Sequence, residues 1–255
     1  MPFTGVRFCL RLQAAAGAIP RPRAFAFRSG SSLNDFILAL PVLVFSLVAH
    51  EYAHGIAAYR QGDDTAYMLG RLTFNPIPHI DPWMSIAFPA ILWFTSNGAF
   101  TFGGAKPIPV NPRKYRKYKR GDIIVSSAGV ITNFGLSFVF TLAFALVGLL
   151  GQSLPSMLPV LVTAQRMMFF GVTLNLVLCF FNLIPIPPLD GSHLFYYLLP
   201  PGLGLKYRSL QRFGFILVLA ILILFRPVIS FFLIPAFWFG SHLLGLVSPY
   251  ALAVS

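Results

Sequence analysis

Long apolar stretches separated by short polar ones dominate the chain. Three of them, at about 36–59, 123–150 and 160–181, are long enough to cross a membrane as helices, since a crossing takes about 20 apolar residues. A fourth, 213–246, is interrupted at Arg226 and forms either one broken helix or a hairpin. The pattern predicts an all-α polytopic membrane protein with a bundle of about five or six transmembrane helices.

The region between the first two crossings has a different pattern. Residues 61–81 are polar and rich in turn formers, and within them 66–74 has the pattern of a short strand. Residues 83–94 are apolar but too few to cross, which favours a re-entrant or interfacial hairpin. Residues 99–110, with paired glycines and two prolines, form a second extended segment. We therefore expect a small membrane-associated β-hairpin or sheet beside the bundle.

Composition supports a membrane protein, because 56% of the residues are hydrophobic, 10% are charged and the mean hydropathy is +0.75. A net charge of +12 is compatible with nucleic-acid binding, but six basic residues lie together in 113–120, directly before a crossing. That position is typical of a cytoplasmic loop under the positive-inside rule. We therefore expect the lipid bilayer as a partner and no nucleic acid.

Residues 1–30 stand apart from the rest. They carry five arginines and no acidic residue, as a transit peptide does; a disordered basic tail and a start codon placed too far upstream are the alternatives. The predicted domains are a basic extension at 1–30 and a single integral-membrane domain at 31–255. A bacterial plasma membrane suits so compact a domain, and an organelle membrane is the alternative if residues 1–30 are a targeting segment.

The motif His50-Glu51-Tyr52-Ala53-His54 lies inside the first apolar stretch. Ionisable groups at membrane depth are costly and mark functional sites. On a helix, His50 and His54 lie one turn apart on the same face, where two imidazoles can bind one zinc ion. Glu51, the only glutamate in the chain, is placed to act as general base on a water molecule beside that metal. In the alternative, both histidines bond to the backbone or to each other, which leaves a buried carboxylate without a partner.

A catalytic zinc site needs a third protein ligand on the same side of the membrane. Counting crossings returns the chain to that side at 182–191, and Asp190 within it is the only acidic residue after Asp122. Prolines prevent a regular helix there, and irregular backbone at membrane depth is tolerated where it is buried in protein or lines a cavity. We therefore expect Asp190 as the third ligand, with a helix-capping aspartate as the alternative. The other histidines lack the helical spacing of a ligand pair: His79, His193 and His242.

The pairing of HEYAH at 50–54 with NLIPIPPLDG at 182–191 resembles the site-2 protease family of intramembrane zinc metalloproteases. The chain is most similar to the compact prokaryotic members, which have no PDZ insertion. Further stretches that resemble the family lie at 70–76, 78–82, 105–112 and 127–129. The resemblance covers about residues 36–195.

The resemblance implies one zinc ion per chain with three ligands and a base: His50, His54 and Asp190 as ligands, and Glu51 as the catalytic base. It also implies that Asn182 helps to hold the substrate carbonyl or the oxyanion, a role that suits an amide donor aimed at developing charge. Asn133 either faces the site or makes an interhelical hydrogen bond.

These features predict an enzyme, a zinc metalloprotease that hydrolyses peptide bonds of transmembrane or membrane-associated proteins within or near the bilayer. A substrate helix must unwind before water reaches its carbonyls, and a strand edge at 66–74 or 99–110 is the expected acceptor of the unwound segment. One alternative is a peptidase that acts on soluble or lipid-tethered peptides. Another is a membrane metal-binding or transport protein that uses the same three ligands. The identity of the substrate and the oligomeric state are left open.

Overall fold

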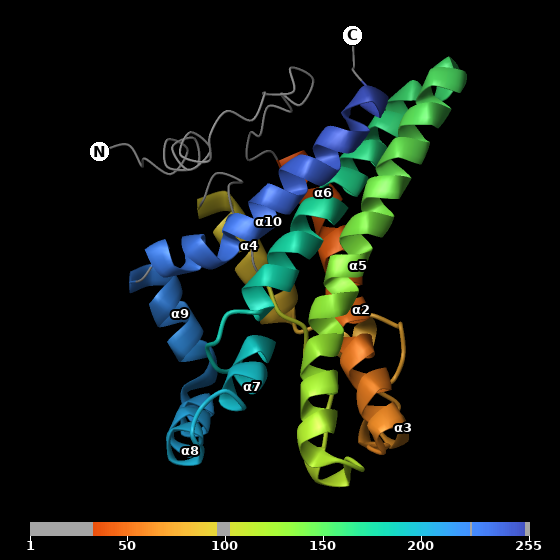
Figure 1. Ribbon diagram of the computed structural model, residues 1–255. Coiled ribbons are helices and arrows are strands. Elements are labelled where there is room, and N and C mark those ends of the chain that lie inside the picture. Colours follow the sequence, from red (N-terminus) through yellow and green to blue (C-terminus); the bar gives the residue numbers. More distant parts are fainter. Residues whose placement is uncertain (1–32, 96–102, 225, 253–255) are drawn as a thin grey trace.

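Residues 33–95, 103–224 and 226–252 are described by the structure, a computed structural model. They form helices joined by short loops, with no strand among them (Figure 1). The α-helices are α2 (Leu33–Gln61), α3 (Thr65–Met68), α4 (Phe88–Thr95), α5 (Tyr118–Ser153), α6 (Leu158–Asn182), α7 (Asp190–Tyr196), α8 (Pro201–Ser209), α9 (Gly214–Leu224) and α10 (Arg226–Val247). The short helical turns are η1 (Ile77–His79), η2 (Pro82–Ala87), η3 (Pro112–Lys114), η4 (Pro155–Met157), η5 (Leu210–Phe213) and η6 (Ser248–Tyr250). The predicted all-helical class is confirmed.

Four helices of the described chain are long and apolar enough to cross a membrane. They are Leu33–Gln61, Tyr118–Ser153, Pro155–Asn182 and Pro227–Tyr250, and the first three contain the predicted crossings. The fourth apolar region is divided into α9 and α10, and α9, with 11 residues, is too short to cross alone. The described residues therefore hold four candidate crossings rather than five or six. Pro82–Thr95 is an apolar helix below the crossing length, as predicted for 83–94, whereas the turn of the predicted re-entrant or interfacial hairpin would fall at 96–102, outside the described residues.

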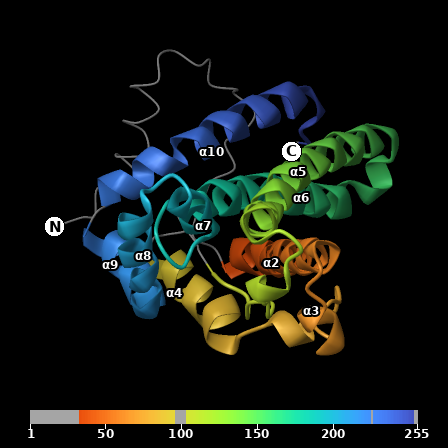
Figure 2. The same ribbon diagram turned by 60° about the horizontal axis from the view of Figure 1, so that its bottom comes forward.

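The crossings pack in layers around α6, which contacts α2, α5 and α10. Figure 2 shows the order plainly: from α10 through α6 and α5 to α2, with α3 and α4 beyond α2. Polar side chains join α6 to α2. The Asn175 amide of α6 donates to the Ser46 hydroxyl of α2 (2.8 Å), and Arg166 of α6 forms an ion pair with Asp35 of α2 (2.6 Å). Buried polar pairs of this kind hold helices together where the surroundings are apolar.

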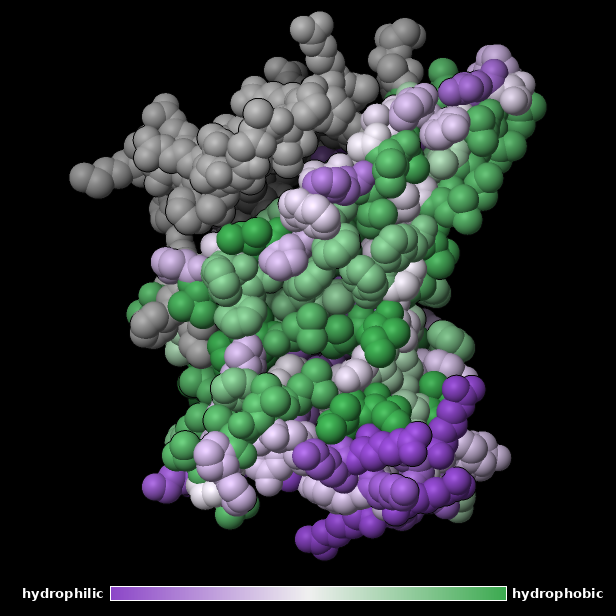
Figure 3. Space-filling model, in the orientation of Figure 1, coloured by the Kyte–Doolittle hydropathy of each residue, from purple (hydrophilic) through white to green (hydrophobic). Residues whose placement is uncertain are grey.

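The surface of the bundle is apolar around its middle and more polar towards its ends (Figure 3). Hydrophilic residues gather at the end of the molecule where α5 begins, within the basic stretch 113–120. The last residue of α2 lies at the same end, because the N–H of Arg116 donates to the carbonyl of Gln61 (2.8 Å). The end of the first crossing and the basic loop therefore share one face, as the counting of crossings requires.

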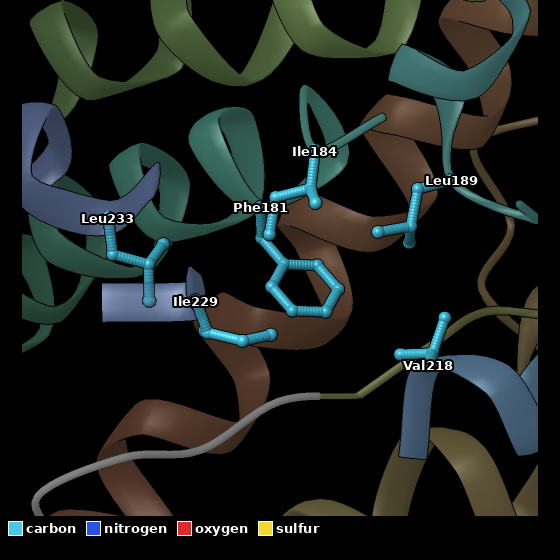
Figure 4. Packing of buried hydrophobic residues seen from close by; sticks show 6 residues of the cluster. All are labelled: Phe181, Ile184, Leu189, Val218, Ile229 and Leu233. Carbon is cyan, nitrogen blue, oxygen red and sulfur yellow. The ribbon is translucent and has the colours of Figure 1, made fainter. Parts of the chain in front are cut away.

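An apolar cluster fixes the end of α6 and the loop that follows it (Figure 4). Its buried members are Phe181, Ile184, Leu189, Val218, Ile229 and Leu233. They come from α6, from the proline-rich loop and from α9 and α10, and in Figure 4 the loop residues and Phe181 point toward one another. The cluster therefore anchors the loop shortly before Asp190.

The strand predicted at 66–74 is wrong. Thr65–Met68 form the single helical turn α3, and Gly70 follows with a positive φ of 64°. The Asp63 carboxylate organises this turn, since it accepts hydrogen bonds from the N–H (3.1 Å) and the hydroxyl (2.5 Å) of Thr65. An aspartate that bonds to the backbone two residues on is a turn signal, and here it outweighs the strand pattern.

The strand predicted at 99–110 also has no ladder partner in the part that is described, which resumes at 103. Its backbone bonds to separate groups instead. The N–H of Lys106 donates to the His79 carbonyl (2.8 Å), and the Arg71 guanidinium donates to the Lys106 carbonyl (3.1 Å). Prolines on both sides of Ile108 also lack the N–H that a strand ladder uses. The predicted β-hairpin is therefore not part of the described fold.

Close packing between α5 and α6 gives a first prediction. A Cβ on Gly171 of α6 would lie 2.3 Å from the ring of Phe140 on α5. We expect Gly171→Val to destabilise the protein by about 1–3 kcal/mol, the usual cost of overpacking, measured by unfolding in detergent. The control is Gly135→Ala, at an exposed position of α5 with nothing within 4 Å of the added Cβ. Equal effects of the two changes would contradict this packing.

Candidate metal centre

Two imidazoles from α2 meet in the interior of the bundle. His50 and His54 are one helical turn apart, only 6% and 9% exposed, and their Nε2 atoms lie 3.0 Å from each other. One turn further on, Ala57 and Ala58 pack against Val125 of α5, so this face of α2 lies close to α5. The spacing of four residues thus places both imidazoles between the two helices.

The Asp190 carboxylate reaches the same point from a distant segment. Its Oδ2 lies 3.3 Å from Nε2 of His50 and 3.2 Å from Nε2 of His54. Ligand atoms of the three residues all lie within 4.8 Å of one another, and they form the one such group found among the described residues. The prolines keep the preceding loop irregular, and the buried Ile184 and Leu189 hold it against the bundle.

The donor set fits zinc. Zinc binds neutral imidazole nitrogen and carboxylate oxygen, and catalytic zinc sites have three protein ligands. Oδ2 of Asp190 is buried and has no hydrogen-bond donor among the described residues. Buried lone pairs that converge in this way need a cation or a proton between them, because nothing else compensates for their desolvation.

The second nitrogen of each imidazole is held by α5. Nδ1 of His54 lies 2.7 Å from the carbonyl oxygen of Val125. A carbonyl only accepts, so Nδ1 carries the proton and donates it, and Nε2 keeps its lone pair for a metal. Nδ1 of His50 lies 3.1 Å from the side-chain amide of Asn133, which is fully buried. Turning that amide over brings its oxygen, which has no other partner among the described residues, to accept from Nδ1.

Gly129 provides the room for these contacts. A Cβ at this position would lie 2.5 Å from Cε1 of His50 and 2.5 Å from Nε2 of His54, closer than real contacts allow. Val125, Gly129 and Asn133 are spaced four residues apart and therefore form one face of α5. This face orients both imidazoles, and such outer contacts usually fix the tautomer of a ligand histidine.

Glu51 lies next to the ligand group without belonging to it. The side chain is half-buried, and its Oε2 accepts a hydrogen bond from the N–H of Ile108 (2.8 Å). The Ile108 side chain is buried against Gly55, one turn after Glu51, where an added Cβ would meet Cδ1 of Ile108 at 2.4 Å. The extended segment after residue 103 therefore lies over α2 and holds the carboxylate in place.

Asn182 lies apart from this group. It is the last residue of α6, it is half-buried, and its amide donates to the Leu178 carbonyl in the same helix (2.9 Å). Within the described residues the amide makes no hydrogen bond to His50, His54 or Asp190. The other histidines also lie elsewhere: His79 and His242 bond to backbone carbonyls, and His193 lies 3.4 Å from Asp122.

Comparison with known proteins identifies the family. Residues 36–225 match the family described as Peptidase family M50. The chain belongs to peptidase family M50. It is 39% identical over 201 residues to "Putative zinc metalloprotease YwhC" of Bacillus subtilis, covering 77% of this chain and 85% of that protein. It is 29% identical over 231 residues to "Putative zinc metalloprotease Rip2" of Mycolicibacterium smegmatis, covering 90% and 83%. No solved structure is a significant match.

Membership in M50, the site-2 protease family, confirms the family that the HEYAH and NLIPIPPLDG motifs predicted. The structure adds contacts that the motifs do not contain. The Val125 carbonyl and the Ile108 N–H are backbone groups, so they leave no mark on side-chain patterns. Only the spacing of Val125, Gly129 and Asn133, four residues apart, indicates in the sequence that these positions share one face of α5.

The crowding at Gly129 gives a second prediction. Gly129→Ala places a methyl group where the two imidazoles lie, so we expect the purified M50 protein to lose most of its bound zinc. Metal analysis after dialysis measures this, and Gly135→Ala, on an exposed face of the same helix, is the control that keeps its zinc. Full zinc in both variants would show that α5 does not lie against the ligands.

Proposed function

We propose that this protein is an intramembrane zinc metalloendopeptidase that cleaves transmembrane or membrane-associated protein substrates. Its membership in an M50 peptidase family, and relatives named as zinc metalloproteases, support the class of enzyme. The observation that carries the site is the convergence of His50, His54 and Asp190 with Glu51 beside them. The first three are the proposed ligands of one zinc ion per chain, and Glu51 is the proposed base.

The depth of the site supports a substrate within the membrane. α2 is long and apolar enough to cross, and His50 lies 11 residues before its last residue, Gln61. At 1.5 Å per residue that is roughly 16 Å from the end of the helix. A peptide bond that reaches this point must come from a polypeptide within the bilayer or drawn into it.

The proposed chemistry divides the work between the metal and the side chains. A zinc ion held by the three proposed ligands would supply Lewis-acid chemistry, polarising a carbonyl and lowering the pKa of a water molecule to about 7. The Glu51 carboxylate, held by the Ile108 N–H, is placed to take a proton from the attacking water and to pass it to the leaving amine. The Nδ1–H groups of both histidines donate to acceptors on α5, the Val125 carbonyl and, with its amide turned over, the Asn133 oxygen, and these contacts keep the imidazoles in one orientation.

Asn182 is the proposed donor to the substrate carbonyl or oxyanion. Two observations support this role: the resemblance of the NLIPIPPLDG motif to the family, and the position of Asn182 at the end of α6, just before the proline-rich loop. The role requires the amide to exchange the Leu178 carbonyl for the substrate.

The proposed location is a bacterial plasma membrane, with 31–255 as one membrane domain and 1–30 as an extension. Four candidate crossings and relatives from bacteria support this assignment. The basic stretch 113–120 indicates that the start of α5 and the end of α2 face the cytoplasm.

The role of Glu51 gives a third prediction. Glu51→Gln removes the base but none of the three ligands, so the variant should keep one zinc per chain while cleavage of a reconstituted transmembrane substrate falls by about 10²–10⁴-fold. Asp190→Ala is the comparison that should lose zinc as well as activity. Unchanged cleavage by Glu51→Gln would refute the protease mechanism, and zinc uptake into vesicles that survives the change would favour a transporter instead.

The contact between Ile108 and Glu51 gives a fourth prediction. Ile108→Pro removes the N–H that orients the carboxylate, so kcat should fall by about tenfold, the loss expected for one charge-assisted hydrogen bond, while zinc content is unchanged. Ile108→Leu keeps both the N–H and a buried apolar side chain, and it is the matched control. Equal kcat in the two variants would show that this hydrogen bond does not serve the base.

A further inference from the structure

A second polar cluster lies where α7 packs against α5. Asp122, in the first turns of α5, is only 3% exposed. Its Oδ2 accepts a hydrogen bond from the hydroxyl of Tyr197 (2.7 Å), and its Oδ1 lies 3.4 Å from Nδ1 of His193. His193 belongs to α7 and Tyr197 follows its last residue.

This cluster acts on the element that begins with Asp190. α7 runs from Asp190 to Tyr196, so His193 lies about one turn after the proposed ligand and Tyr197 one turn further. The loop before Asp190 is irregular, and its apolar anchor ends at Leu189. Apolar packing alone sets no direction for a carboxylate, whereas two hydrogen-bonding contacts to one buried aspartate fix how α7 lies on α5.

The same face of α5 makes both kinds of contact. Asp122 lies three residues before Val125, and Gly129 and Asn133 continue the face at intervals of four. Val125 and Asn133 hold the imidazoles directly, and Asp122 holds α7. Asp122 is also the last charged residue before 43 positions without one, 123–165, so its charge lies at the edge of an apolar region where an unpaired carboxylate is costly.

We propose that Asp122 is a positioning residue for the third zinc ligand: through Tyr197 and His193 it fixes α7 so that the Asp190 carboxylate meets the two imidazoles. The inference rests on the proposed function, because it takes Asp190 to be a ligand. It makes α5 the support of all three ligands, two directly and one through α7.

The chemistry of the cluster suits a fixed support rather than a separate site. Burial, together with the hydrogen bond to Asp122 and its charge, raises the pKa of the Tyr197 hydroxyl well above its usual range, so the phenol stays protonated and donates. Asp122 and His193 belong to no group of three metal-binding side chains among the described residues, so the pair forms no metal site of its own.

The test compares zinc affinity, measured by competition with a chelator, among four variants of the purified full-length protein. Asp122→Asn and Tyr197→Phe each remove part of the contact between Asp122 and α7. Both should bind zinc about 10-fold less tightly, the low end of the loss caused by removing a direct partner of a ligand, because they act through α7. Tyr196→Phe is the matched control: it removes the neighbouring hydroxyl, which has no hydrogen bond in the described structure, and should bind zinc as the unchanged protein does. Asp190→Ala tests whether Asp190 is a zinc ligand, since loss of a ligand should abolish tight zinc binding.

These measurements distinguish the positioning role of Asp122 from the proposed zinc-binding role of Asp190. If Asp190→Ala loses zinc while Asp122→Asn and Tyr197→Phe bind it as tightly as Tyr196→Phe, the positioning role is overturned and the proposed function stands. If Asp190→Ala keeps its zinc affinity, the ligand set is wrong and the positioning role fails with it. A role in stability alone also overturns the inference, and it would appear as a lower unfolding temperature of the zinc-free variants with unchanged zinc affinity. Tyr197→Phe removes a single oxygen atom, so it decides the question even if Asp122→Asn does not fold.

Discussion

The contact between one face of α5 and the polar groups brought to it by α2 and α7 is the constraint on which the rest of the structure depends. Polar groups at membrane depth are tolerated only where each has a partner. Successive positions on this face meet that requirement: Asp122, Val125, Gly129 and Asn133. Three of them supply a hydrogen-bonding group, and the glycine supplies space. The spacing of a straight helix is thus sufficient to bring together the three proposed zinc ligands, which come from residues 50, 54 and 190.

The remaining backbone around the site follows from the same requirement. The loop before Asp190 has too many prolines for a helix. The apolar cluster around Phe181 anchors it instead and, in our proposal, so does the contact of Asp122 with Tyr197 and His193. The extended segment on the other side of α2 is held by two carboxylates, because Glu51 accepts from the N–H of Ile108 and Asp63 accepts from the N–H of Asn111 (2.5 Å). These two bonds fix the extended segment on α2, which carries both the proposed base Glu51 and the two imidazoles.

Much of this could be predicted from the sequence because periodicity and topology are visible in it. The i, i+4 spacing predicted that His50 and His54 share one face of a helix, and the long apolar stretches predicted three of the four candidate crossings. Counting crossings brought Asp190 to the same face, and in the structure it lies 3.2 Å from His54. The strand at 66–74 was wrong because the turn at Asp63, a side-chain bond to the backbone, overrides the local pattern. The contacts of Val125 and Ile108 could not be predicted, since they use backbone groups whose partners depend on tertiary packing.

The central claim is that two imidazoles and one carboxylate from distant segments bind a single zinc ion. X-ray absorption spectroscopy at the zinc edge of the purified protein tests this most directly. We expect about one zinc per chain, a first shell of nitrogen and oxygen at about 2.0–2.1 Å, and the multiple scattering of two imidazoles. A shell with sulfur at about 2.3 Å, which would implicate a cysteine, or scattering from three or more imidazoles would contradict it.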